Sequence, residues 1–338
     1  MTVIKRASVT LADVAEAAGV SRSTASRALN DSPRISEATK RRIRGIADRI
    51  GFAPNAQARA LAVGRAETIA MLVTEPVDEL FGDPTYGVFL RGITERLSEY
   101  EYLPVLLQAS TEHERTRVQR HFERRSFDAV IDVSPYEGGE LLDVLQRLGI
   151  PTVLCGQLEG HPYDHIFSTV YSDDAAGARM AADAIIDRGR THCAVIMGPA
   201  DNPASRDRVE GYRSSLRDNL DDHMIVYTGW SASDGFQAIC RLLDSGERID
   251  GVLAGSDRIA SGVIEALRGR GLSVPDDVSV IGFDDHPIAK TTTPTLTTIH
   301  QPLMEEGRCA AELALGMIEG APPSTVVMDM SLIIRDSL

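Results

Sequence analysis

The sequence predicts an α/β protein: a helix-turn-helix unit of three helices at the N-terminus, followed by a larger body with two doubly wound, parallel-sheet lobes. Three observations support this prediction. From residue 68 onward, short apolar runs alternate with helical stretches, as in parallel strands joined by crossover helices. The 338 residues exceed the size of one ordinary domain. Residues 1–65 carry 12 Lys and Arg against 5 Asp and Glu, although the whole chain has a net charge of −14.

The N-terminal unit starts with two short helical patterns. Thr10 and Asp13 have the spacing of a capping box, and apolar residues recur at helical spacing over residues 11–18. Gly19 ends this helix and Ser21 can cap the next one. The outer face of that second helix carries Arg22, Ser23, Ser26 and Arg27. Such a pair of helices is typical of a helix-turn-helix, whose second helix enters the major groove of DNA. An ordinary helical hairpin with solvated arginines is the alternative.

A third helix and a linker follow. Ser36 can cap a helix whose first turns are crowded with basic residues at 40–44, and whose isoleucines lie on one side. Residues 56–62 are rich in alanine and contain Arg59 and Leu61. A helix this short is only marginally stable alone, so we expect this linker to form a helix only when it is supported by other contacts.

The segments VTLADVAEAAGVS, SRALN and PNAQARALAVGR resemble signatures of the LacI family of transcriptional regulators, and the resemblance continues along most of the chain. It implies that Arg22 and Ser23 read bases, that Arg27 contacts the groove, and that Leu61 wedges into the minor groove beside Asn55 and Ala58. Arginine can contact guanine bidentately, and an apolar wedge kinks DNA, so the chemistry suits these roles. The complete set of expected DNA-binding residues is Thr10, Ser21, Arg22, Ser23, Thr24, Ser26, Arg27, Asn55, Ala58 and Leu61.

The charge distribution fits this division. Residues 1–65 have a net charge of +7, which leaves −21 on residues 66–338. A basic head on an acidic body is expected if only the head approaches phosphate groups.

The resemblance implies a helix-turn-helix domain at 1–54, a hinge helix and linker at 55–66, and an effector-binding and dimerisation domain at 67–338. This last domain resembles periplasmic sugar-binding proteins, with lobe 1 at about 67–169 and 296–323 and lobe 2 at about 170–295 and 324–338. Crossings between the lobes are expected near Val170, Thr295 and Ser324. The predicted strands are 69–74, 103–108, 129–133, 152–155, 165–169, 193–197, 224–227, 251–254, 278–282 and 326–333. The predicted helices are 85–100, 174–188, 206–219, 235–243 and 257–269.

Asp284 and Arg208 are the first two candidates for binding an effector. Asp284 follows a strand, where its carboxylate could accept hydrogen bonds from two sugar hydroxyls. An Asx-turn or a helix cap is the alternative. Arg208 begins an R-x-x-G segment that matches the family, although Arg206 is a rival and a surface salt bridge is the alternative for both.

Four further candidates are Trp230, Ser256, Asp83 and Tyr86. Trp230 is the only tryptophan and could stack on a pyranose, although a core position is its ordinary role. Ser256 stands where the family commonly has asparagine, and it could simply cap the following helix. Asp83 and Tyr86 lie in residues 75–86, interpreted as a long loop that either lines the ligand cleft or merely varies at the surface.

Together these features predict a homodimeric repressor that binds a pseudo-palindromic double-stranded DNA operator and is switched by a mono- or oligosaccharide. A purine corepressor is the alternative effector. The chain ends soon after its last predicted strand, without the leucine-heptad segment that tetrameric relatives carry, so a dimer is expected. The motifs of nucleotide-binding or hydrolytic enzymes are missing, so no catalytic residue is expected. A secreted sugar-binding protein would need a signal peptide, and none is visible.

The remaining signals concern cofactors and location. The four cysteines lack the spacing of a metal site, so neither a metal nor a cofactor is expected. The sequence has no apolar run long enough to cross a membrane, so we expect no membrane partner and a cytoplasmic, nucleoid-associated protein.

Overall fold

The computed structural model describes residues 9–52, 65–133, 139–156, 163 and 165–338. The chain divides into two compact units, Met1–Ala66 and Glu67–Leu338. Residues 55–62, which include the expected hinge helix with Asn55, Ala58 and Leu61, lie outside the described residues.

The N-terminal unit contains three helices around a small core. They are α1 (Leu11–Ala18), α2 (Arg22–Leu29) and α3 (Glu37–Ile50). The capping box predicted for α1 is confirmed, because Asp13 N–H approaches Thr10 Oγ1 and Thr10 N–H donates to the Asp13 carboxylate at 2.7 Å. The core of the unit consists of Val14, Ala18, Ala28, Ile43 and Ala47. Small alanines at the contacts let three short helices pack closely.

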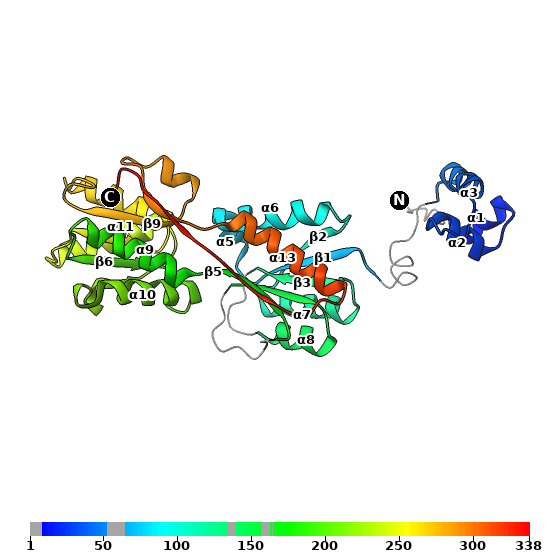
Figure 1. Cartoon of the computed structure of the whole chain (residues 1–338), viewed down its shortest axis with the longest axis horizontal. Helices are drawn as coiled ribbons and strands as arrows, with labels where there is room; N and C mark the ends of the chain where they lie inside the picture. The colour runs from blue at the N-terminus through cyan, green and yellow to red at the C-terminus, as the bar shows by residue number, and fades with distance from the viewer. Residues whose placement is uncertain (1–8, 53–64, 134–138, 157–162, 164) are drawn as a thin grey trace, which may run out of the picture. The chain divides into compact units, whose positions relative to one another are not determined.

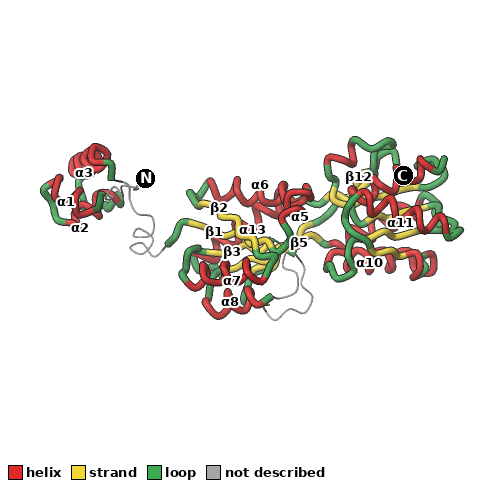
Figure 2. Tube along the Cα trace, turned by 180° about the vertical axis from the view of Figure 1, so that it is seen from behind, coloured by secondary structure: helices red, strands yellow, loops and turns green. Residues whose placement is uncertain are grey.

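The second unit contains two six-stranded sheets, each covered by helices on both faces (Figures 1 and 2). The first sheet has the strand order β11-β5-β4-β3-β1-β2 and is parallel throughout. The second has the order β12-β10-β9-β8-β6-β7, and only the edge strand β12 is antiparallel. The predicted doubly wound class is therefore confirmed.

The first lobe is built on the first sheet. Its strands are β1 (Thr68–Val73), β2 (Leu103–Gln108), β3 (Ala129–Asp132), β4 (Thr152–Cys155), β5 (Ser168–Ser172) and β11 (Thr325–Met328). Its helices are α5 (Val77–Gly82), α6 (Pro84–Ser98), α7 (Glu112–Glu123), α8 (Glu140–Leu148) and α13 (Leu303–Ile318). In β1, Ile69 faces the core formed with α6 and α13, and Ala70 faces the core formed with α7 and α8. This alternation follows from the two-residue period of a strand.

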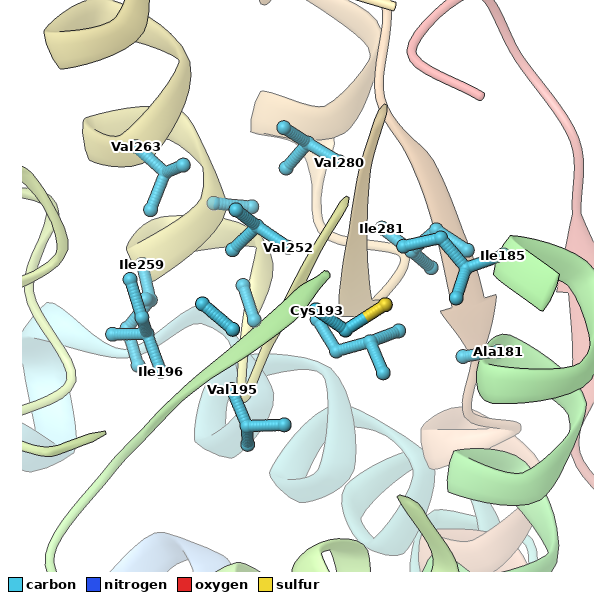
Figure 3. Packing of buried hydrophobic residues seen from close by; sticks show 14 of the residues in the cluster. Ala181, Ile185, Cys193, Val195, Ile196, Val252, Ile259, Val263, Val280 and Ile281 are labelled. Atoms are coloured by element: carbon cyan, nitrogen blue, oxygen red, sulfur yellow. The ribbon is translucent and has the colours of Figure 1, made fainter. Parts of the chain in front are cut away.

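The second lobe is built on the second sheet. Its strands are β6 (Cys193–Met197), β7 (Ile225–Tyr227), β8 (Gly251–Ala254), β9 (Ser279–Asp284), β10 (Thr297–His300) and β12 (Ser331–Ile333). Its helices are α9 (Asp174–Asp187), α10 (Pro203–Leu216), α11 (Ala232–Asp244) and α12 (Asp257–Gly269), with short 3-10 turns at Arg217–Asn219, Asp222–Met224 and Pro287–Lys290. Figure 3 shows Ile259 and Val263 of α12 on one side of the strands, and Ala181 and Ile185 of α9 on the other.

Three predicted elements need correction. Residues 77–82 form helix α5 instead of a loop, because acidic residues occupy its first turn and Leu80 is buried. The strand expected at 165–169 lies at Ser168–Ser172, where it pairs with β4 and β11. The single strand expected at 326–333 is two strands, β11 and β12, which belong to different sheets.

The lobe boundaries are correspondingly wrong by a few residues. Strand β5 belongs wholly to the first sheet, so the chain first leaves that lobe after Ser172 and not near Val170. Strand β10 belongs to the second sheet, which moves the return from Thr295 to the start of α13. The last crossing follows Met328, not Ser324. In each case the sheet that a strand joins, which the apolar pattern does not encode, decides where the chain crosses.

Candidate functional site: the recognition helix and the interlobe cleft

The exposed surface of α2 carries most of the predicted DNA-binding side chains. Ala25 and Ala28 are buried against the other two helices, which turns Arg22, Ser23 and Arg27 outward. Ser26 and Thr24 are half-buried on the same helix. A helix held in this way presents its polar side as one continuous surface, as groove recognition requires.

The hydroxyl groups at the start of α2 form a connected cluster. Ser21 caps the helix by accepting a hydrogen bond from Thr24 N–H at 3.1 Å. Its Oγ atom also lies 2.9 Å from Ser23 Oγ and 2.8 Å from Thr24 Oγ1. The positive end of a helix dipole with adjacent hydroxyls suits a DNA phosphate. Thr10, in contrast, is held by Asp13 in the cap of α1, so a DNA contact by Thr10 stays a prediction.

Some of the basic residues at the start of α3 have structural roles. Lys40 is buried, and its Nζ lies 2.7 Å from Glu37 and 3.0 Å from Asp31. Arg44 contacts Asp31 as well, at 2.9 Å. These ion pairs connect α3 to the turn after α2, so Lys40 and Arg44 help to position α2.

A cavity of about 1010 Å³ lies between the two lobes of the second unit. Residues at the carboxyl ends of strands from both sheets line it, which is where ligands bind in doubly wound folds. All six side chains predicted from the sequence to bind an effector line this one cavity: Asp83, Tyr86, Arg208, Trp230, Ser256 and Asp284.

Arg208 is the buried centre of the cleft. Its Nε donates to Asp174 Oδ1 at 2.6 Å, and its Nη1 donates to the Gly255 carbonyl at 2.5 Å. Nη1 also lies 3.4 Å from Asp284 Oδ1, and the guanidinium stacks on the Phe283 ring at 3.7 Å from its centroid. Burial alone would lower the pKa of Arg208, but the two carboxylates outweigh it and raise the pKa. Arg208 is therefore a fixed cation at the floor of the cleft.

Asp284 is held in an unusual conformation at the end of β9. Its φ angle is +99°, a region that residues with a side chain seldom adopt. The amide of Gln301 donates to Asp284 Oδ1 at 2.6 Å, and Arg208 approaches the same oxygen. Backbone strain of this kind is typical of side chains that must be aimed at a ligand.

Trp230 and Ser256 combine a structural role with a place in the cavity wall. The Trp230 ring lies over Gly198, where an added Cβ atom would come within 2.2 Å of the ring. Ser256 caps α12 by accepting a hydrogen bond from Ile259 N–H at 3.2 Å. The sequence alternative of a helix cap is therefore correct for Ser256, although its position also lines the cleft.

Polar contacts connect the two lobes beside the cavity. The Asp83 carboxylate caps α6 in the first lobe and lies 3.1 Å from Arg258 of α12 in the second. Thr85 Oγ1 lies 3.0 Å from Nε2 of His286, a buried residue after β9. Arg258 and His286 are not among the residues predicted from the sequence. Their positions after strands β8 and β9 were the available signal, because such positions face the cleft.

Two buried carboxyl groups near the cleft have raised pKa values. Glu306 of α13 lines the cavity and accepts a hydrogen bond from the Ser172 hydroxyl at 2.7 Å, and burial raises its pKa to about 7. Asp257 of α12 is bonded by the Thr298 hydroxyl and by His286 N–H, at 2.6 and 2.7 Å. Burial, together with the nearby charge of Asp284, raises the pKa of Asp257 to about 8. Neither carboxyl group is among the residues predicted from the sequence.

The cavity lining is strongly acidic. Among the described residues that form it, two carry a guanidinium group, Arg115 and Arg208. Ten carry a carboxyl group: Glu75, Glu79, Asp83, Glu112, Glu140, Asp174, Asp201, Asp207, Asp284 and Glu306. Carboxylates accept hydrogen bonds from hydroxyl groups, so this wall suits a ligand rich in hydroxyls.

The head and the body each match a known protein family. Residues 10–55 match the bacterial regulatory proteins of the lacI family, and residues 182–338 match a periplasmic binding protein-like domain. No helix in the described part of the chain is long and apolar enough to span a membrane.

Individual relatives resemble the chain from end to end. The HTH-type transcriptional regulator CelR of Thermobifida fusca is 32% identical over 98% of this chain and 99% of its own. The ribose operon repressor of Escherichia coli K12 is 33% identical over 91% of this chain and 93% of its own. A solved structure of a CelR–cellobiose complex superimposes with a TM-score of 0.76 at 31% identity, covering 97% of this chain and 99% of that one. The chain therefore belongs to the LacI family of bacterial transcriptional regulators.

Proposed function

We propose that this protein is a transcriptional repressor whose affinity for an operator is controlled by a sugar bound in the cleft between its two lobes. The observation that carries the proposal is the meeting of Arg208 and Asp284 on the floor of a cavity of about 1010 Å³ with Tyr86 and Trp230 in its walls. A guanidinium donates hydrogen bonds to sugar hydroxyls, and a carboxylate accepts hydrogen bonds from them. Aromatic rings can pack on the C–H face of a sugar. The cellobiose complex of CelR supports the same class of ligand.

Operator recognition is assigned to α2 and the hinge. Arg22 and Ser23 are the proposed base-reading residues, and both are exposed on α2. Leu61, with Asn55 and Ala58 beside it, is the proposed minor-groove wedge, because an apolar side chain between base steps kinks the duplex. Sugar binding would change how the two lobes lie relative to each other and so weaken the contacts that stabilise the hinge. A coupling free energy of about 1–3 kcal/mol between sugar binding and operator binding is sufficient for this effect.

We also propose a homodimer that acts at the nucleoid in the cytoplasm, on a pseudo-palindromic operator. Strand β2 is an edge strand of the first sheet, and it exposes Leu103 by 62% and Leu106 by 40%. Tyr100, just before this strand, is also exposed. An apolar sheet edge of this kind favours burial against a second subunit. Two subunits would present two recognition helices to two half-sites.

A DNA titration of the full-length protein tests the proposal. The probe is labelled DNA from upstream of the protein's own gene, at one fixed salt concentration, since phosphate contacts make affinity steeply dependent on salt. The titration is repeated with cellobiose, glucose, ribose and a purine base. Weakening of specific binding by one sugar supports a sugar-induced repressor. Binding that requires the purine would overturn the sugar proposal, and equal binding to unrelated DNA would overturn the operator proposal.

A further inference from the structure

We propose that the cleft takes an electrically neutral saccharide and rejects the phosphorylated or carboxylated form of the same sugar. This inference rests on the proposed function and specifies the chemistry of its effector. It follows from three features of the cavity: the excess of carboxyl groups, the neutralised arginine, and the starts of the helices that open onto it.

The first feature is the charge of the wall. Ten carboxyl groups and two guanidinium groups line the cavity among the described residues. Arg258 adds one positive charge near the rim, where it pairs with Asp83. An anionic ligand would enter a field that is negative overall, inside a partly enclosed space where charges are screened less than at a surface.

The second feature is the neutralisation of Arg208. Arginine binds phosphate or carboxylate most strongly through two parallel N–H groups of its guanidinium. Here Nε is bonded to Asp174 at 2.6 Å, and Nη1 is shared between the Gly255 carbonyl at 2.5 Å and Asp284 at 3.4 Å. Two carboxylates face one cation, so the cluster presents no net positive charge to a ligand. It remains well suited to hydroxyl groups, which need both donors and acceptors.

Arg115 does not change this balance. It is half-buried on α7, and its Nη1 donates to the Ser110 carbonyl at 3.2 Å. Glu112 lies one turn earlier on the same helix and also lines the cavity. Any anion that approached Arg115 would therefore approach a carboxylate as well.

The third feature concerns the helix N-termini, which are the other common source of anion affinity. Three helices that start at the cavity are capped by side chains that line it: Asp83 accepts from Thr85 N–H, Asn202 from Ala204 N–H and Ser256 from Ile259 N–H. Three others lack a side-chain cap, and these are α5, α8 and α13. Each of the three carries a glutamate in its first turn that lines the cavity: Glu79, Glu140 and Glu306. A ligand anion at any of these helix starts would meet a carboxyl group already there.

Calorimetric titration of the full-length protein with matched sugar pairs tests the inference. The pairs are glucose with glucose 6-phosphate and glucose with glucuronate, in which the pyranose ring is kept and the anionic member carries one charged group at C6. An added negative charge is repelled by the acidic wall of the cavity. We therefore expect the anionic member to bind at least about 100-fold more weakly than its neutral parent.

A double variant separates charge from shape. In Glu79→Gln/Glu140→Gln the anionic sugar is expected to gain about 3- to 10-fold relative to the neutral one, because two nearby negative charges are removed. The control is Glu123→Gln/Glu265→Gln, which changes the net charge equally at two exposed glutamates that do not line the cavity. We expect the control to leave the ratio unchanged. Higher salt should also reduce the difference in affinity between the neutral and the anionic sugar, because it screens the repulsion.

The possible results point in different directions. An anionic sugar that binds as tightly as its parent overturns this inference and leaves the proposed function intact. If neither salt nor the double variant alters the difference in affinity between the two sugars, the selectivity comes from shape, and this result also overturns the inference. If no sugar of either kind binds, the proposed function fails and this inference fails with it.

Discussion

Arg258 of α12 lies 3.1 Å from the carboxylate of Asp83, which joins the second lobe to the first at the rim of the cleft. Asp83 also caps α6. Two residues later, Thr85 Oγ1 lies 3.0 Å from Nε2 of His286 in the second lobe. The start of α6 is thus held by two polar contacts from the other lobe. Asp83 and Thr85 both line the cavity, so these contacts lie where a bound ligand would meet both lobes.

The first prediction concerns this ion pair. Arg258→Ala should weaken sugar binding by about 3- to 10-fold, up to ~1.4 kcal/mol, because it removes the contact that holds the cavity-lining carboxylate of Asp83 in place. Calorimetry measures the change. Arg270→Ala is the matched control, since Arg270 forms an ion pair with Asp244 at 2.7 Å within the second lobe. Equal sugar affinities for the two variants would show that the Asp83 contact has no part in binding.

The second prediction concerns Asp284. Asp284→Asn should lower sugar affinity by more than about 10-fold while operator affinity stays within about 2-fold of the original, because the carboxylate is a hydroxyl acceptor remote from α2 in sequence. Asparagine tolerates the positive φ angle of +99°, so this variant separates chemistry from backbone strain. Asp284→Ala should also abolish the sugar response, with additional loss of stability. A normal sugar response in Asp284→Asn would remove its charge from the mechanism.

The third prediction concerns the pH dependence of stability. The pKa of Asp257 rises from 3.8 to about 8 on folding, so the folded protein keeps a proton that the unfolded chain releases. Asp257 therefore makes the second unit less stable as pH rises from about 4 to about 8, and its effect levels off above that range. Asp257→Asn should flatten this slope, because an amide can keep the contacts with Thr298 and His286. Thermal unfolding at several pH values measures it.

The control for that measurement is Asp244→Asn. Asp244 is exposed, and its hydrogen bond from Arg270 lowers its pKa below 3.8. Its substitution should shift stability by a nearly constant amount above about pH 4 and change the pH dependence only in more acidic solution, so the slope between about pH 5 and about pH 8 stays in place. If the stability of the original protein and of Asp257→Asn varies with pH in parallel, Asp257 is not the source of the pH dependence.

The fourth prediction concerns base reading by the recognition helix. Arg22→Ala should cost about 1–3 kcal/mol on the operator and relax specificity at one base position, because a bidentate contact to guanine is lost. Arg49→Ala is the comparison, since Nε of Arg49 donates to the Gly45 carbonyl of its own helix at 3.1 Å. Competition against random DNA provides the readout. If Arg22→Ala weakens operator and random DNA equally, Arg22 contacts only phosphate.

Much of the fold follows from local sequence patterns. The predicted limits of β2, β4, β6, β8 and α12 agree with the structure at both ends. These strands are compact runs of apolar residues bounded by polar ones, and α12 lies between a serine cap and a terminal glycine. Local signals of this kind do not depend on the rest of the molecule.

The errors have a common physical cause. Strand β5 contains Ser168, Thr169 and Ser172, so it has no apolar run, yet it is buried between β4 and β11. The division between β11 and β12 depends on which sheet each strand joins, and no local pattern encodes that choice. Two of the three wrong crossings follow from these strands, and the third follows from β10, which joins the second sheet.

The candidate site shows the same limit. Asp284 and Arg208 were predicted because they occupy positions that resemble the family's motifs, and both line the cavity. Arg258 and His286 lack such a motif, and their partners Asp83 and Thr85 belong to the other lobe. The contacts arise only when the lobes are placed side by side, so sequence patterns alone could not predict them.

The central claim is that sugar binding and operator binding are linked in one molecule. The most direct test is to measure sugar affinity by Trp230 fluorescence, with and without saturating operator DNA, and operator affinity with and without saturating cellobiose or whichever sugar binds. Trp230 is the only tryptophan and lines the cavity. Linkage predicts that each ligand weakens the other by the same factor, about 5- to 150-fold. Sugar affinity that is the same with and without operator DNA would contradict the account.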